Sequence, residues 1–179
     1  MQLTSSSKGR EAEIAELFRA SFTASEGAEE GALIGTLARD LIVTTDPADI
    51  HVFLAEDAGA LVGTCVFTRL RHDGETRTVL LLSPVAVAPD RQGQGIGQRM
   101  ITHGLGALRV IGAEMVVTYG DPAFYGRLGF APVAKDFVPA PFPLSHPEGW
   151  LGQSLTDQPL TPLRGRATCA PALSDPAFW

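Results

Sequence analysis

The feature that most constrains the fold is a glycine-rich turn between an apolar run and a helix-like run. Residues 80–87 are mostly apolar, and they lead through 88–91 into a stretch with glycine at positions 93, 95 and 97. Glycine permits positive φ and lets another molecule come close to the backbone. The first turn of a following helix leaves its N–H groups unpaired. The segment therefore predicts either an anion site, suited to a pyrophosphate, or a plain tight connection from strand to helix.

Two familiar phosphate loops do not fit this turn. A Walker loop ends in Gly-Lys-Ser or Gly-Lys-Thr, and neither tripeptide occurs in the chain. A dinucleotide fingerprint needs a glycine three positions after Gly95, where Gln98 stands. The strand before the turn also lies in an antiparallel meander instead of opening a parallel unit. A nucleotide-dependent enzyme is therefore not expected.

The hydrophobic periods around the turn predict an α/β fold. Apolar residues at helical spacing indicate two amphipathic helices near 11–22 and 33–41, with Ser5–Ser7 as candidate N-caps. Glycine and proline separate the remaining segments. We predict strands over 51–55, 61–70, 78–87, 115–119, 150–155 and 166–169. We predict two further helices, over 95–111 and 122–128. The early strands suggest an antiparallel meander, and the later alternation of strand and helix suggests a parallel unit. We expect a mixed, strongly twisted sheet of about six or seven strands flanked by about four helices.

The length of the chain predicts a single domain over residues 1–179. Its core is expected over 1–135. The proline-rich residues 136–179 are expected to be a C-terminal extension of the same domain, because their few short apolar runs cannot build a second core.

Composition and charge exclude several classes of partner. The net charge is −6 and the 14 Lys and Arg residues are scattered, whereas nucleic-acid binding draws on clustered cations. The chain has no signal-peptide layout at its start and no apolar run of about 18 residues, so we expect a cytoplasmic protein without a membrane partner. Cys65 and Cys169 lack the spacing of metal or redox sites. Buried, reduced thiols and no metal are therefore expected.

Two motifs resemble those of the GNAT superfamily of N-acetyltransferases. The run 85–97 resembles the acetyl-CoA motif Q/R-x-x-G-x-G/A, with Gln92, Gly95 and Gly97 at its fixed positions. Further along, residues 121–130 resemble the second signature, a short helix that bears a tyrosine and closes in Gly-Phe. The order of elements agrees as well, so the resemblance covers residues 3–133.

This resemblance implies that acetyl-CoA is the acetyl donor and lies in a split between two parallel strands, here 85–87 and 115–119. Pro84 cannot donate to a ladder and is typical of a bulge that turns a strand away from its neighbour. The N–H of Val87 is then the expected donor to the thioester carbonyl. The residues assigned to acetyl-CoA are Val85, Ala86, Val87, Gln92, Gly93, Gln94, Gly95, Ile96, Gly97, Gln98, Phe124 and Arg127. For Arg127, a solvated side chain is the alternative.

The departing thiolate needs a proton, and the resemblance assigns that task to Tyr125. A phenol remains protonated near neutral pH and can supply one. The alternative is an aromatic residue that only packs beside Phe124 and Phe130.

The base that deprotonates the amine has no assigned residue. Many family members carry a glutamate on the strand that corresponds to 78–83, which here has none; only Glu75 stands nearby. The candidates are water held by Ser83, or a histidine such as His72 or His146, because imidazole takes and returns protons near neutral pH. The alternative is that both histidines are solvated loop residues.

The acceptor is the least determined part of the prediction. A small amine or amino-acid derivative is our first expectation for the acceptor, followed by a protein N-terminus or lysine. The alternative function is that of a non-enzymatic protein that binds acetyl-CoA. The irregular residues 137–150 either wall an acceptor pocket or wrap the surface. A monomer or homodimer is expected.

Overall fold

The computed structural model describes residues 1–179 and divides into two compact units. The first unit contains 1–67 and 84–104, and the second contains 68–83 and 105–179. The helices and strands are β1 (Gln2–Thr4), α1 (Glu11–Glu26), α2 (Ala28–Thr44), β2 (Ile50–Asp57), β3 (Ala60–Arg69), β4 (Arg71–His72), β5 (Val79–Val87), α3 (Ile96–Val110), β6 (Met115–Tyr119), α4 (Pro122–Tyr125), β7 (Ala131–Pro132), β8 (Trp150–Ser154) and β9 (Ala167–Thr168). Short 3₁₀ turns lie at Pro89–Arg91, Gly126–Leu128, Pro147–Gly149, Pro171–Leu173 and Pro176–Phe178.

The main sheet has seven strands in the order β1-β2-β3-β5-β6-β8-β7 and is mixed, which confirms the predicted α/β class. β5 takes part in both units, because the division falls between Ser83 and Pro84. The short strands β1, β4 and β7 were not predicted. They hold only two or three residues each, too few to show a period of two.

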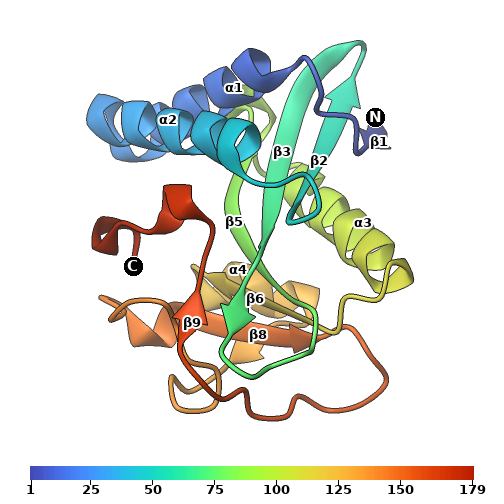
Figure 1. Ribbon diagram of the computed structural model, residues 1–179. Coiled ribbons are helices and arrows are strands. Elements are labelled where there is room, and N and C mark those ends of the chain that lie inside the picture. The colour runs from blue at the N-terminus through green and yellow to red at the C-terminus, as the bar shows by residue number, and fades with distance from the viewer. The chain divides into compact units, whose positions relative to one another are not determined.

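In the first unit, α1 and α2 lie side by side (Figure 1). Their close approach depends on glycine: a Cβ on Gly31 would lie 2.6 Å from the carbonyl oxygen of Arg19. The two helices bury the apolar stripe that predicted them, including Ile14 and Leu41. The expected caps at Ser5–Ser7 are wrong: α1 begins after Arg10, which makes no side-chain cap bond.

The middle of α3, at Gly104, packs on the β2–β3 face that carries the rings of Phe53 and Phe67. These rings meet edge to face, with centroids 5.7 Å apart, and a Cβ on Gly104 would lie 2.9 Å from the Phe53 ring. Successive side chains of a strand point to opposite faces. The buried neighbours of these phenylalanines in sequence, Leu54 and Val66, therefore point to the other face.

In the second unit, β6 is a central strand. It pairs in parallel with β5 from Val79–Met115 to Leu82–Thr118, and antiparallel with β8 from Met115–Ser154 to Tyr119–Trp150. A parallel pair needs a long crossover, and α3 lies in the segment that supplies it. β4 and β9 form a separate two-stranded sheet.

The proline-rich residues 136–179 lie in the second unit together with 105–135. An aromatic cluster anchors them. The ring of Trp150 is 1% exposed, its Nε1 donates to the carbonyl of Val138 at 2.8 Å, and its centroid is 6.0 Å from that of Trp179. Burying large rings in this way holds an otherwise irregular segment in place.

The cysteines agree with prediction. Cys65 and Cys169 are both free and buried, and burial raises the pKa of each thiol. A thiol whose pKa is raised is a poor nucleophile and metal ligand. None of the helices has the length and apolarity that crossing a bilayer demands.

Candidate functional site

The glycine turn lies in the first unit, between β5 and α3. Gly93 and Gly95 have φ of 73° and 74°, in the left-handed region that favours glycine. A Cβ at either position would have no atom within 4 Å. These positions therefore require glycine for backbone conformation, and the space beside them is open to a ligand.

The N-terminus of α3 presents unpaired donors at this turn. The first i→i−4 bond of the helix runs from the N–H of Arg99 to the carbonyl of Gly95, so the N–H groups of residues 96–98 have no such partner. The first turn carries no acidic residue, which would compete with an anion there. The Ile96 side chain is buried, so its contribution to a ligand is limited to the backbone.

Side chains around the turn brace it. Gln92 Nε2 donates to the carbonyl of Val87 at 3.2 Å, and Gln94 Nε2 donates to the carbonyl of Asp90 at 3.4 Å. Arg91 forms an ion pair with Asp57. Arg91 is therefore already neutralised, whereas Arg99 Nη2 donates to the carbonyl of Gln94 at 3.2 Å and places a second cation at the turn. An anion there would meet backbone N–H groups, the helix dipole and the charge of Arg99.

Between two of its hydrogen bonds to β3, the β5 segment has one residue more than the β3 segment opposite it. Ala88 N–H donates to the carbonyl of Val62 at 2.9 Å, and Leu70 N–H donates to that of Val79 at 3.0 Å. Between these bonds β3 advances by eight residues (62 to 70) and β5 by nine (79 to 88). One extra residue in one of two antiparallel strands is a β-bulge. Its span includes the predicted position, Ser83–Pro84.

The parallel pairing with β6 ends at Leu82–Thr118, so residues 85–87 lie beyond that ladder. Ala86 is buried, whereas Val85 and Val87 are half-buried. This alternation leaves the two valines on the same face of the strand.

In the second unit, α4 carries the residues of the second motif. Asp121 caps this helix by accepting from the N–H of Ala123 at 2.8 Å, and proline occupies its first position. The Tyr125 ring meets the rings of Phe124 and Phe130 edge to face, at 5.0 and 5.7 Å between centroids. Tyr125 is thus packed and half-buried at once. Arg127 is exposed.

The candidate base His72 and the nearby acid Glu75 are both held by other contacts. His72 is not a solvated loop residue as the alternative held: it is 5% exposed in β4, and its Nε2 donates to the carbonyl of Pro139 at 2.9 Å. Glu75 is held by Arg77, with Oε2 2.6 Å from Nη2 and Oε1 2.9 Å from Nε. These bonds lower the pKa of Glu75 to about 2, which makes it a weak base.

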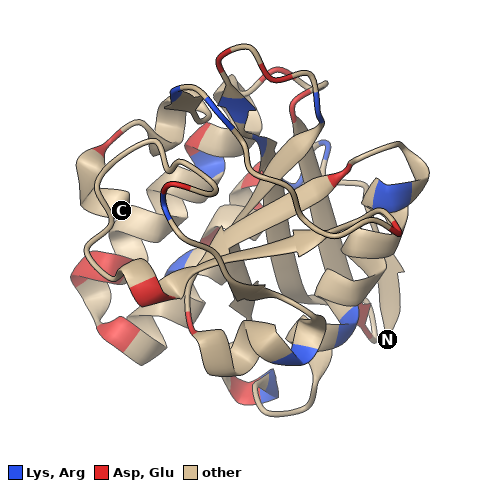
Figure 2. Cartoon of the chain, turned by 90° about the horizontal axis from the view of Figure 1, so that it is seen from below, with Lys and Arg blue, Asp and Glu red and all other residues tan.

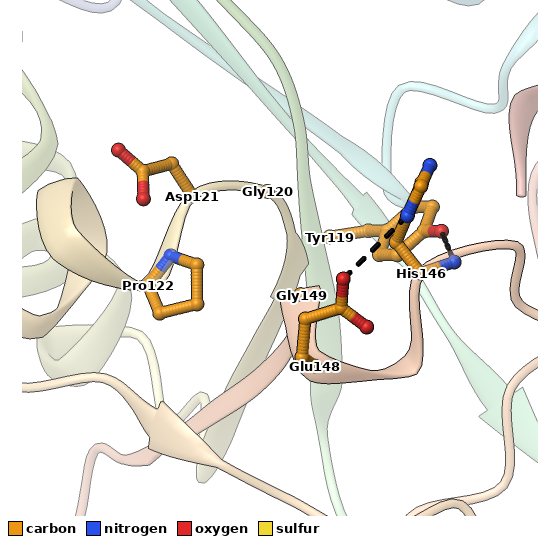
Figure 3. Close-up of a pocket in the computed structure, with 7 residues that line it drawn as sticks. All are labelled: Tyr119, Gly120, Asp121, Pro122, His146, Glu148 and Gly149. Carbon is orange, nitrogen blue, oxygen red and sulfur yellow. Dashed lines mark hydrogen bonds and ion pairs between the residues drawn. The ribbon is translucent and has the colours of Figure 1, made fainter.

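His146, the other histidine among the candidate bases, is exposed where His72 is buried. Its side chain is 79% exposed, and it lines a pocket of about 340 Å³ in the second unit (Figure 3). The pocket is lined by Tyr119, Gly120, Asp121, Pro122, His146, Glu148 and Gly149.

Sequence reasoning did not single out Tyr119 or Glu148 as site residues. Tyr119 ends a parallel strand, and the carboxyl ends of such strands are a common place for ligands, so that signal was present. Glu148 had no comparable signal. Its position depends on how the irregular residues 137–150 fold back onto β6.

Comparisons with known proteins agree with this geometry. A family model described as an acetyltransferase (GNAT) domain matches residues 48–132. The uncharacterized N-acetyltransferase YjhQ of Escherichia coli is 43% identical over 122 residues, which are 65% of this chain and 67% of that protein.

Two solved structures share the fold. The GNAT family N-acetyltransferase YhbS of Escherichia coli, solved with CoA, has a TM-score of 0.80 and 24% identity over 97% of this chain and 92% of that one. A GNAT family acetyltransferase from Brucella melitensis, solved with acetyl-CoA, has a TM-score of 0.75 and 25% identity, over 97% of each chain.

The mixed α/β sheet, the bulged β5 and the glycine turn at the N-terminus of α3 belong to the fold that these acetyltransferase structures share. The chain belongs to the GNAT superfamily of acetyl-CoA-dependent N-acetyltransferases.

Proposed function

We propose that this N-acetyltransferase transfers the acetyl group of acetyl-CoA to the primary amine of a small molecule. The observation that carries the acceptor class is the 340 Å³ pocket beside the helix of Tyr125. That volume lies within the range of small-molecule sites, about 300–1,000 Å³.

For the donor, we assign the pyrophosphate of acetyl-CoA to the N–H groups at the glycine turn. The positive φ of Gly93 and Gly95, the free N–H groups of α3 and the open space beside both glycines support this assignment. The pantetheine arm is assigned to the backbone of Val85 and Val87, because these residues lie beyond the β5–β6 ladder. Phe124 and the exposed Arg127 are assigned to the rest of the cofactor.

The chemistry follows from acyl transfer. The neutral amine attacks the thioester carbon, the N–H of Val87 donates to the developing oxyanion, and the C–S bond then breaks. Tyr125 donates its phenolic proton to the departing thiolate, and the phenolate recovers a proton from solvent or takes the extra proton of the cationic nitrogen formed by the attack. The Tyr125 ring lies against Gly120, because a Cβ on that glycine would be 2.6 Å from the ring. Gly120 also lines the pocket, so the ring adjoins the pocket wall.

The test is direct turnover. Protein, acetyl-CoA and a panel of small primary amines are mixed, and both free CoA thiol and the acetylated amine are measured. We expect stoichiometric thiol and N-acetyl product with at least one amine. A protein that binds acetyl-CoA but acetylates only peptides, or no amine at all, would overturn the proposed acceptor class.

A further inference from the structure

The wall of the pocket in the second unit is held by two backbone hydrogen bonds and by one bond to the side chain of Tyr119. His146 N–H donates to the Tyr119 hydroxyl oxygen at 2.6 Å, Gly120 N–H to the Gly149 carbonyl at 2.9 Å, and Gly149 N–H to the His146 carbonyl at 2.9 Å. Gly149 also allows close packing, because a Cβ there would lie 3.0 Å from the Gly120 carbonyl oxygen. The end of β6 and the 146–149 turn are therefore held together as one wall.

The surface of this pocket is chiefly carbon, with charge on one side. The lining includes Tyr119, Pro122 and two glycines, and it contains no lysine or arginine. Glu148 and His146 extend toward one another from the same turn, with Oε1 3.5 Å from Nδ1 (Figure 3). Asp121 is the other acid, but its carboxylate caps α4 and points away from this pair (Figure 3).

Such a lining discriminates between amines. A protonated amine is attracted by Glu148, whereas a substrate carboxylate close to the amine would meet an acid and no cation. The carbon surface offers burial to an apolar body attached to that amine. Glu148 and its imidazole neighbour are mostly exposed, so the pair remains accessible from solvent.

We propose that this pocket is the acceptor site and that it takes primary amines with an apolar body and no carboxylate beside the amine. This inference rests on the proposed function and narrows its substrate class. Glu148 binds the ammonium form of the acceptor. The imidazole of His146 accepts one proton from that ammonium, which leaves the neutral amine to attack the thioester, and later releases the proton to solvent.

The first test concerns charge. Phenethylamine and phenylalanine share an aryl-ethyl body, and only the second carries a carboxylate. We expect kcat/KM to favour phenethylamine by about fivefold or more, the effect of roughly 1 kcal/mol from an exposed charge. Glu148→Gln should raise KM for phenethylamine by a similar factor and narrow the preference, while Asp157→Asn, an exposed acid in the turn after β8, should change neither. An undiminished preference in Glu148→Gln would overturn the role of Glu148.

The second test concerns the proton. His146→Ala keeps the backbone N–H that bonds Tyr119, so the wall should survive and melting should change little. We expect kcat to fall by about 10²- to 10⁴-fold at unchanged acetyl-CoA affinity, and added imidazole to restore part of it. A merely structural side chain would not give such rescue. Near-wild-type kcat in this variant would remove His146 from the reaction.

The outcomes distinguish a failure of the proposed function from a failure of the proposed acceptor site. If no amine in the panel yields thiol, the proposed function itself is wrong. If amines turn over but the variants of Glu148 and His146 behave as wild type, the enzyme stands and this pocket is not its acceptor site.

Discussion

At the scale of single residues, Tyr125 is where packing and chemistry can be separated. Its ring contacts Phe124 and Phe130, so phenylalanine in its place keeps both contacts and nearly the same volume. The substitution removes only the phenolic oxygen and its proton. For Tyr125→Phe we expect unchanged acetyl-CoA affinity and a kcat lower by about 10²- to 10⁴-fold, as measured by thiol release. Retention of more than half of kcat would leave the ring with a packing role alone.

Gly95 allows a similarly matched experiment. Its substitution by aspartate places a negative charge and a side chain at the proposed pyrophosphate position. Gly74 is a control of the same backbone type, with φ of 76° against 74° and no atom within 4 Å of a Cβ. Both variants should lose comparable stability from the strained φ, roughly 1 kcal/mol. Only Gly95→Asp should abolish acetyl-CoA binding in calorimetry; equal binding by the two would place the site elsewhere.

At the scale of elements, the turn before β5 is tied to a distant segment through Arg77. This guanidinium pairs with Glu75 and donates to the carbonyl of Pro162 at 2.8 Å and that of Thr161 at 3.2 Å. Arg77 therefore links the segment before β5 to residues 161–162 of the C-terminal extension, and Glu75 holds its guanidinium by the ion pair.

The pH dependence of this link has a definite sign. The folded pKa of Glu75 is about 2, below its unfolded value, because Arg77 favours the carboxylate. A lowered pKa contributes stability that is present above the unfolded value, about 4.3, and is lost as pH falls through the folded value. In urea titrations Glu75→Gln should cost about 1 kcal/mol at pH 7 and progressively less from pH 4 toward pH 2. A cost independent of pH would show that the charge is not responsible.

Most elements with a clear period were predictable. The helical spacing of Ile14 and Leu17 and the apolar run of residues 78–87 correspond to α1 and β5. The predicted cap at Ser5–Ser7 was wrong because the start of α1 also depends on the chain that precedes it. There β1 occupies Gln2–Thr4 through its pairing with β2. That pairing partner lies some fifty residues away, as Leu3 pairs with Ala55, so no local pattern contains it.

At the scale of the whole molecule, ligand binding should raise thermal stability. A ligand at 100 times its Kd adds about 2.7 kcal/mol when it binds only the native state. For a chain of this length, that corresponds to a rise in Tm of about 5–11 °C. We expect such a rise with acetyl-CoA in a melting scan and its loss in Gly95→Asp. Absence of any shift at millimolar acetyl-CoA would contradict the donor site.

The expected absence of a nucleic-acid partner stays a prediction. In the view of Figure 2, acidic and basic residues are interspersed. A phosphate backbone is bound through neighbouring cations, which requires them to be gathered.

Sequence alone determined the local part of the site, because a glycine turn, a helix start and a short tyrosine helix are properties of adjacent residues. Gly93 and Gly95 could be singled out on that basis, whereas Tyr125 was singled out by the resemblance to the GNAT motif; the roles of all three are proposals. Tertiary structure decided what brings distant residues together: it buried His72 against Pro139 and set His146 and Glu148 beside Tyr119. The physical reason is that hydrophobic period specifies an element but not its partner, and an irregular proline-rich segment has no period to read. Its course depends on long-range contacts such as the bond from Trp150 to Val138 and the pairing of β8 with β6.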